Sequence, residues 1–244
     1  KRYQIQAVWR AERNQKGRYR EFFQCDADVV GSPSLLYEAE LMQIFDQVFQ
    51  KLGLKVIIRI NNRKLLDALA QALNRKDEFL RIVTIVDKLD KIGWQGVERE
   101  LKGLGLTDEE YAFLHNCLSA RSLEEAQKYL QNPRAEEGFG ELQQVFDLLQ
   151  SYTFANRFEI DFTLARGLNY YTGCIFEVVV DKTAAGQENL VMGSIASGGR
   201  YDNLTAIFDL PDVSGVGISF GADRIYDLLL ELKKFPDETF DQTQ

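Results

Sequence analysis

The strongest constraint on the fold is a pair of strand-like segments near the start of the chain, separated by a polar stretch. Tyr3–Trp9 and Glu21–Val30 are rich in aromatic and β-branched residues, which is typical of strands. Asn14 and Gly17 lie between them and suit a turn. We therefore predict a β-hairpin with a long basic loop.

The second segment of this hairpin has two chemically different faces, because side chains alternate along a strand. One face carries three polar residues, Gln24, Asp26 and Asp28. The other carries the residues that we expect in the core, namely Phe23, Cys25, Ala27 and Val29.

Positive charge is concentrated in the hairpin, although the whole chain has a net charge of −8. Seven of the 29 Lys and Arg residues lie within the first 20 positions, which hold one of the 37 acidic residues. Guanidinium groups match phosphate oxygens, whereas carboxylates and amides suit ammonium or imidazole groups. One interpretation is a site for a polyphosphate beside a cationic organic substrate. The alternative is a solvated basic loop on an ordinary hairpin.

Composition places the chain among globular proteins. It has 244 residues, 45% hydrophobic and 27% charged. There is no apolar run of the ~20 residues that a membrane helix needs, and no secretory signal at the start. Three scattered cysteines favour a reducing, cytoplasmic location. The chain begins without Met inside a strand pattern, so we expect a piece of a longer protein.

Several chemistries lack the residues they need. His115 is the single histidine, and it lies in a helix-like stretch, so a His/Cys zinc site and a Ser-His-Asp triad are not expected. There is no Walker-type phosphate loop. The negative net charge argues against a non-specific nucleic-acid binder.

The order of patterns divides the chain into three parts. Residues 1–74 continue from the hairpin into a helix from Ser34 to Gly53, a strand over 55–60, a turn at 61–62 and a helix over 63–73. Residues 75–152 read as short helices, with predicted capping boxes at Thr107 and Ser122. Residues 153–244 return to strands over 158–162, 174–180, 195–197 (as a sheet edge) and 213–220, followed by a helix from Gly221. We predict an α+β fold with a helical insertion between two sheet-forming parts; the alternative is that these helices form a layer of one continuous domain.

Glycines in the last part suggest a close approach of a ligand or of another backbone segment. Gly215, Gly217 and Gly221 could leave a flat floor for a planar ring, and Gly198 and Gly199 could do the same on a neighbouring strand. From the residues alone, buried ion pairs remain an alternative role for Arg166 and Arg224, as does core packing for Tyr170 and Tyr171.

Four segments together resemble a known family. The hairpin resembles motif 2 of class II aminoacyl-tRNA synthetases, and Gly221-Ala-Asp-Arg224 with its helix resembles motif 3. Leu164-Ala-Arg-Gly-Leu-Asn-Tyr-Tyr-Thr-Gly173 and Ser197-Gly-Gly-Arg-Tyr-Asp202 are similar to the two signatures of the histidyl-tRNA synthetase family. The resemblance covers nearly the whole chain. It implies a class II antiparallel β-sheet flanked by helices, with an α-helical insertion subdomain.

The resemblance also implies a reaction and roles for the cationic residues. Histidine and ATP give histidyl-adenylate and pyrophosphate, and histidine then passes to tRNA(His). Arg10 and Arg166 correspond to catalytic arginines near the α-phosphate. The ATP-binding residues implied by the resemblance are Arg10, Glu12, Arg18 and Arg224. Arg166 stands where other class II enzymes use a metal.

The residues that the resemblance assigns to histidine come from both parts of the sheet. They are Gln24 for the α-amino group, Asp28 for the imidazole, and Arg166, Tyr170, Tyr171 and Tyr201 for the rest of the pocket. Asn169 replaces the family's commoner Asp, with little effect expected.

The implied partners are histidine, ATP with its Mg²⁺, and tRNA(His), with no protein-held metal and no membrane. The family is a homodimer, but its motif 1 interface and its anticodon-binding domain are not within this chain. Activity of the isolated chain is therefore not expected.

Two other functions are the alternatives. A catalytically inactive regulatory paralogue would bind histidine or tRNA without chemistry, and such relatives typically lose the signature arginines, which are present here. A plain nucleic-acid-binding module would use the basic loop and would ignore histidine and ATP.

Overall fold

A computed structural model describes residues 1–11, 17, 19–166 and 170–235. The described residues form a seven-stranded sheet with the order β1-β2-β7-β6-β5-β3-β4. The strands are β1 (Arg2–Trp9), β2 (Glu21–Val30), β3 (Val56–Asn62), β4 (Arg157–Ile160), β5 (Cys174–Val180), β6 (Ala196–Arg200) and β7 (Gly215–Gly221). All neighbours are antiparallel except β3 and β4, which are parallel. The predicted α+β fold with an antiparallel sheet is confirmed, and a parallel pair at one edge is added.

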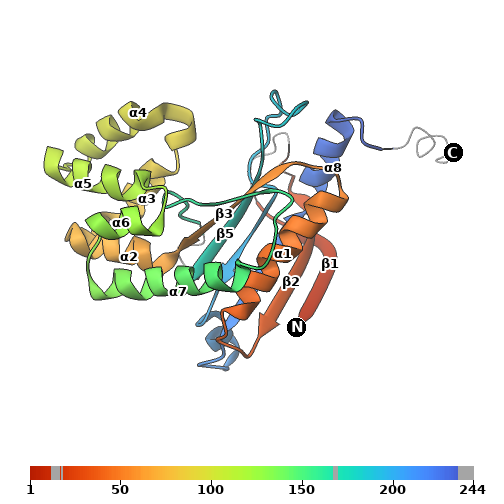
Figure 1. Cartoon of the computed structure of the whole chain (residues 1–244), viewed down its shortest axis with the longest axis horizontal. Coiled ribbons are helices and arrows are strands. Elements are labelled where there is room, and N and C mark those ends of the chain that lie inside the picture. The colour runs from red at the N-terminus through yellow and green to blue at the C-terminus, as the bar shows by residue number, and fades with distance from the viewer. Residues whose placement is uncertain (12–16, 18, 167–169, 236–244) are drawn as a thin grey trace.

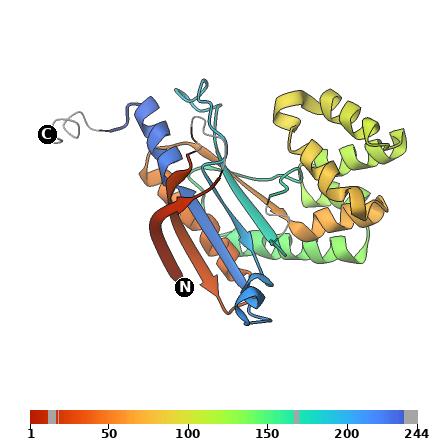
Figure 2. The same ribbon diagram turned by 180° about the vertical axis from the view of Figure 1, so that it is seen from behind.

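Helix α1 (Leu36–Lys51) covers one face of the sheet (Figures 1 and 2). Its Phe45 and Phe49 are fully buried, and their ring centroids lie 5.2 and 5.8 Å from that of Phe220 in β7. Because side chains alternate along β7, Ser219 and Gly221 face the opposite side. Burial of these large rings supplies apolar stabilisation of about 1.5–3 kcal/mol per side chain.

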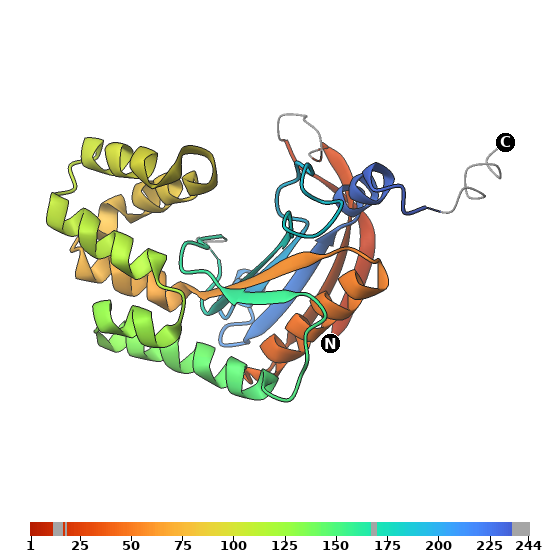
Figure 3. The same cartoon turned by 45° about the horizontal axis from the view of Figure 1, so that its top comes forward.

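The helical block stands at the β4 edge of the sheet, as Figure 3 shows. The block comes after α2 (Arg63–Ala72) in the chain. It consists of η1 (Lys76–Glu78), α3 (Phe79–Val86), α4 (Leu89–Gly103), α5 (Asp108–Ser119), α6 (Leu123–Tyr129) and α7 (Pro133–Leu149). Helix α7 contacts α1, α2 and β3 as well as α6, so it joins the block to the sheet. The chain ends with η2 (Leu204–Phe208) and α8 (Ala222–Glu231). The boundaries at 74/75 and 152/153 stay a prediction.

Of the two predicted capping boxes, one is confirmed in full and the other in part. The capping box at Thr107 has both reciprocal hydrogen bonds with Glu110. Ser122 caps α6 through its side chain, but the Glu125 carboxylate accepts from the Arg121 N–H instead. Only half of the second predicted box is therefore formed.

Three local predictions are corrected. The turn expected at Asn61-Asn62 is the end of β3, and the Asn62 side chain caps α2. Strand β6 lies inside the sheet between β5 and β7, so it is not an edge. Phe23, expected in the core, is 51% exposed: its pairing with Ala7 of β1 continues, but the β2–β7 pairing ends at Gln24–Gly221, where α8 begins.

The return from the helical block is fixed by a buried acid. Asp46 of α1 is 1% exposed and accepts hydrogen bonds from the Tyr152 hydroxyl and from the backbone N–H groups of Ala155 and Asn156, at 2.8–3.0 Å. In the described ranges, the helices are all too short or too polar to cross a bilayer. The cytoplasmic location stays a prediction.

Candidate functional site

A cavity of about 580 Å³ opens on the sheet face opposite α1. Its lining includes Arg10, Arg166 and Arg224, which come from three distant segments of the chain. Gln24 of β2 and Ser219 of β7 lie in the same lining. We call this cavity the arginine cleft. The sheet register brings these residues together, because Gln24 of β2 is paired with Gly221 of β7, two residues after Ser219.

Arg10 enters the cleft from the base of the hairpin. Its backbone N–H donates to the Arg20 carbonyl at 2.9 Å, which continues the β1–β2 pairing by one step. Its guanidinium carbon lies 5.1 Å from the ring centroid of Phe22, another lining residue. Such a cation–π contact holds the guanidinium on the cleft side of the sheet.

Arg224 lies in the first turn of α8 and ties two loops together. Its Nε donates to the Gly17 carbonyl at 2.6 Å, and its Nη1 donates to the Ser194 carbonyl. The neighbouring Asp223 accepts from the Phe23 N–H at 2.6 Å. The start of α8 is thereby fixed against the hairpin, with its Arg on the cleft.

Arg166 enters the cleft from the opposite side and forms an ion pair between its Nε and the Glu177 carboxylate of β5. The side chain of Arg166 is 45% exposed, whereas that of Glu177 is 8% exposed. The ion pair that the sequence analysis gave as an alternative role for Arg166 is therefore formed. Arg166 nevertheless also lines the arginine cleft.

Gln24 is held in place by its neighbour across the sheet. Its Nε2 donates to the Ser219 hydroxyl at 2.8 Å. The predicted sharing of one face by Gln24, Asp26 and Asp28 is confirmed by their pairing with Gly221, Ser219 and Gly217.

A second group of predicted residues lies further along the same sheet face. Asp28 follows Gln24 by four residues, which corresponds to about 13 Å along a strand. The Tyr201 hydroxyl donates to Asp28 Oδ1 at 2.6 Å. Tyr171 lies over Gly199, which is paired with Gly217. We call Asp28, Tyr171 and Tyr201 the tyrosine–aspartate cluster.

Three glycines make room for this cluster. A Cβ added to Gly217 would lie 2.0 Å from Asp28 Oδ1, and one added to Gly215 would lie 2.2 Å from the Tyr201 ring. A Cβ on Gly199 would lie 2.8 Å from the Tyr171 ring. The planar groups on these glycines are thus the protein's own rings and carboxylate.

Burial raises the pKa of both phenols in the cluster. For Tyr201 the second cause is its hydrogen bond to Asp28, and for Tyr171 it is the charge of the adjacent Tyr170. The ring centroids of Tyr170 and Tyr171 lie 4.4 Å apart, and Tyr170 is 48% exposed. Both phenols therefore keep their protons near neutral pH, so Tyr201 donates to the Asp28 carboxylate.

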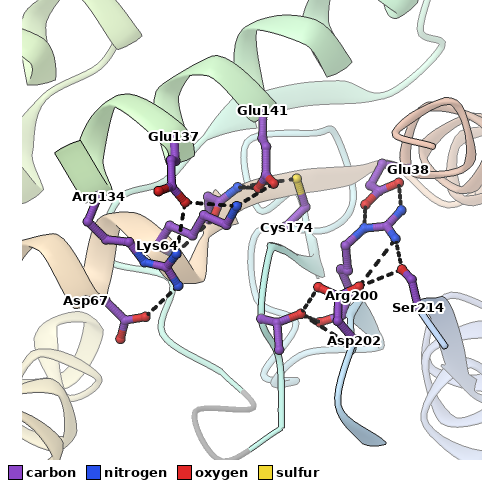
Figure 4. A network of polar contacts seen from close by, with 12 residues as sticks. Glu38, Lys64, Asp67, Arg134, Glu137, Glu141, Cys174, Arg200, Asp202 and Ser214 are labelled. Atoms are coloured by element: carbon purple, nitrogen blue, oxygen red, sulfur yellow. Dashed lines mark hydrogen bonds and ion pairs between the residues drawn. The ribbon is translucent and has the colours of Figure 1, made fainter. Parts of the chain in front are cut away.

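The cluster is supported from the α1 side by a buried ion pair (Figure 4). Arg200, at the end of β6, is 3% exposed and bonds the Glu38 carboxylate of α1 through Nε and Nη2. Burial raises the pKa of the Glu38 carboxyl, and Arg200 opposes the rise. Asp202 accepts from the hydroxyls of Thr172 and Ser214. Tyr201 lies between two anchored residues, and Tyr171 precedes a third.

The structure brings together many, but not all, of the predicted site residues. Arg10, Gln24, Arg166 and Arg224 line the arginine cleft, and the tyrosine–aspartate cluster lies further along the same face, outside the lining of that cleft. Glu12, Arg18 and Asn169 lie outside the described residues. Within the described part of the chain, no group of three or more His, Cys, Asp or Glu is placed to hold a metal.

Sequence reasoning missed two residues. Lys91 of α4 lines the arginine cleft from the helical block, and nothing in its sequence context marks it. Glu177 is the partner of Arg166, and it had a signal, because it is the one charged residue in the apolar strand Cys174–Val180.

Comparisons with known proteins agree with this architecture. A family model described as histidyl-tRNA synthetase matches residues 3–225. Histidine–tRNA ligases from Bacteroides fragilis and Christiangramia forsetii are 49% and 48% identical over 100% of this chain and 54% of their own length. The chain thus spans about half the length of the curated relatives it matches.

A solved structure of histidyl-tRNA synthetase from Nostoc sp. PCC 7120 is similar with a TM-score of 0.83. It is 34% identical, and the match covers 96% of this chain and 55% of that one. With the family model matching most of its length, this chain belongs to the histidyl-tRNA synthetase family.

Proposed function

We propose that this chain is the catalytic core of a histidine–tRNA ligase. The observation that carries the proposal is the meeting of Arg10, Arg166 and Arg224 in one cleft, with a carboxylate and two protonated phenols further along the same sheet face. Family membership supports the same activity. The substrates are histidine and ATP with its Mg²⁺, and the acceptor is tRNA(His).

In the first step, a histidine carboxylate oxygen attacks the α-phosphorus of ATP. The bond from that phosphorus to the β-phosphate oxygen breaks, and pyrophosphate leaves. A carboxylate is ionised at pH 7, so the attack needs no general base. Negative charge grows on the phosphoryl oxygens, and fixed guanidinium groups stabilise it. Arg10 and Arg166 act at the α-phosphate, and Arg224 acts at the γ-phosphate.

In the second step, a hydroxyl of the terminal ribose of tRNA(His) attacks the carbonyl carbon of the adenylate, and AMP leaves. Histidine is recognised by the tyrosine–aspartate cluster, where Asp28 accepts a hydrogen bond from an imidazole N–H. Gln24, four residues before Asp28 on β2 and in the lining of the arginine cleft, orients the α-amino group. Glu12 and Arg18 complete the nucleotide contacts in this proposal.

Histidine-dependent exchange of pyrophosphate into ATP tests the proposal in the protein at its full length. Exchange that depends on histidine, and that Arg166→Ala slows far more than it weakens histidine binding, is the expected result. Binding of histidine without any exchange would instead indicate a regulatory relative. Binding of nucleic acid that ignores histidine and ATP and falls steeply with salt would indicate a nucleic-acid module. The homodimer stays a prediction, tested by sedimentation of the same protein.

A further inference from the structure

A buried carboxylate stands between two arginines on the open face of the sheet. Glu177 is 6% exposed, and its carboxylate pairs with Arg166 Nε. Its second cation, Arg59 of β3, is its direct cross-strand partner, but Arg59 Nη1 lies 4.0 Å away. Arg59 has closer acidic partners, at 3.4 Å from Glu159 and 3.5 Å from Asp161. Glu177 therefore depends on Arg166 for its closest counter-charge.

The register places Glu177 immediately beside the arginine cleft, on the same face of the sheet. It is paired with Ser197 of β6, and Ser197 lines the cleft, whereas Glu177 does not. Arg166 thus contacts both the cleft and Glu177, which lies one strand away from the cleft. A group in this position does not touch a ligand in the cleft, and it acts on the ligand only through the arginine.

We infer that Glu177 is a positioning residue that fixes the orientation of the Arg166 guanidinium at the cleft. The inference rests on the proposed function, in which Arg166 acts at the α-phosphate. A buried carboxylate that loses its cation is costly, so the pair resists rotation of the otherwise half-exposed arginine. The contact is made through Nε, and a guanidinium carries four further N–H groups on its two terminal nitrogens, which suit bidentate contact with a phosphate.

Positioning matters most when charge develops in the transition state. An arginine displaced by about 1 Å still attracts ATP, but it no longer meets the phosphoryl oxygens correctly, and such errors cost about 100-fold in rate. Glu177→Gln keeps the size of the side chain and removes its charge. It is expected to lower the rate of adenylate formation by about 100-fold, with small changes in the KM for histidine and ATP.

The chain offers a matched control in Glu159. It lies on the same sheet face, next to the same Arg59, but its ion pairs in the described part of the chain are with Arg59 and Arg157, the latter at 2.9 Å, and not with Arg166. Glu159→Gln removes an equal charge from the same row of residues. It is expected to leave the rate of adenylate formation within about twofold of the wild type.

The experiment measures single-turnover adenylate formation in the full-length protein, with its melting temperature recorded for each variant. In a double-mutant cycle, Arg166→Ala combined with Glu177→Gln is expected to be no slower than Arg166→Ala alone, since both changes remove one function. If Glu177→Gln does not fold, Glu177→Asp, which keeps the charge but shortens the reach, replaces it.

The outcomes separate this inference from the proposed function. Absence of histidine-dependent activity in the wild type would overturn the proposed function. An active wild type with equal rates for the Glu177 and Glu159 variants would overturn the positioning role alone. Additive losses in the double-mutant cycle would also overturn it, because they would mean that Glu177 acts independently of Arg166.

Discussion

Replacing Gly217 by Ala tests whether the tyrosine–aspartate cluster reads histidine. The added Cβ would lie 2.0 Å from Asp28 Oδ1 and 2.9 Å from its Cγ, whereas an ordinary contact is 3.4 Å or more. The carboxylate must therefore turn away by more than 1 Å, and the oxygen that moves is the one that accepts from Tyr201 at 2.6 Å. The Ala27 carbonyl, at 3.3 Å from the added Cβ, would also have to shift by a few tenths of an ångström.

The size of the effect follows from the bond that the carboxylate is proposed to make with histidine. A hydrogen bond to a charged group contributes about 1.5–3 kcal/mol, and each 1.4 kcal/mol corresponds to about a factor of ten. The kcat/KM for histidine should therefore fall by about 10- to 100-fold in pyrophosphate exchange, chiefly through KM. The KM for ATP should stay within about twofold, because neither Gly217 nor Asp28 lines the arginine cleft.

Gly140→Ala is the matched control for this substitution. Gly140 lies exposed in α7, where an added Cβ meets nothing within 4 Å. Ala in a helix interior stabilises by about 1 kcal/mol relative to Gly, so the control should melt slightly higher and keep full activity. A folded Gly217→Ala protein with an unchanged kcat/KM for histidine would refute the role given to Asp28.

Three further predictions concern charge. Glu38→Gln leaves the buried Arg200 without its carboxylate and should lower the free energy of unfolding in urea by about 3–5 kcal/mol; a loss below about 1 kcal/mol would contradict this. Hydrogen bonds from Arg75 lower the pKa of Glu110 to about 2, so its stabilising effect is complete above pH 4.5 and fades as the pH falls from there toward 2. The difference in melting temperature between the wild type and Glu110→Gln should shrink from pH 7 to pH 3.5, and a constant difference would contradict the shift. Lys91→Ala should raise the KM for ATP by up to about fivefold without changing the melting temperature; an unchanged KM would remove Lys91 from the site.

Much of the fold was predictable from local patterns. Strands β2 and β5 begin and end where alternation and β-branched residues place them, and Thr107 starts α5 through its capping box. These features depend on residues close together in the sequence. The position of β6 inside the sheet could not be predicted from local patterns. Ala196–Arg200 is short and glycine-rich, and only its pairing with β5 and β7 defines it as an inner strand.

The candidate site was predictable where a residue's chemistry is unusual for its place. A polar face on β2 pointed to Gln24 and Asp28, and the glycines of β7 pointed to a close approach. What approaches those glycines was not predictable, because it depends on contacts between residues more than 170 positions apart in the sequence, such as the hydrogen bond from Tyr201 to Asp28. The same limit hid Lys91, which reaches the cleft only through the placement of the helical block.

Strands from before and after the helical block are interleaved in the sheet, so the two halves of the chain should stay associated even if the chain is cut between them. Strand β3 lies between β4 and β5, β2 pairs with β7, and Asp46 binds the returning backbone at Ala155 and Asn156. Neither part has a complete sheet alone. A single protease cut within the block, at the exposed Arg121, would thus leave two fragments that stay associated and separate only in denaturant.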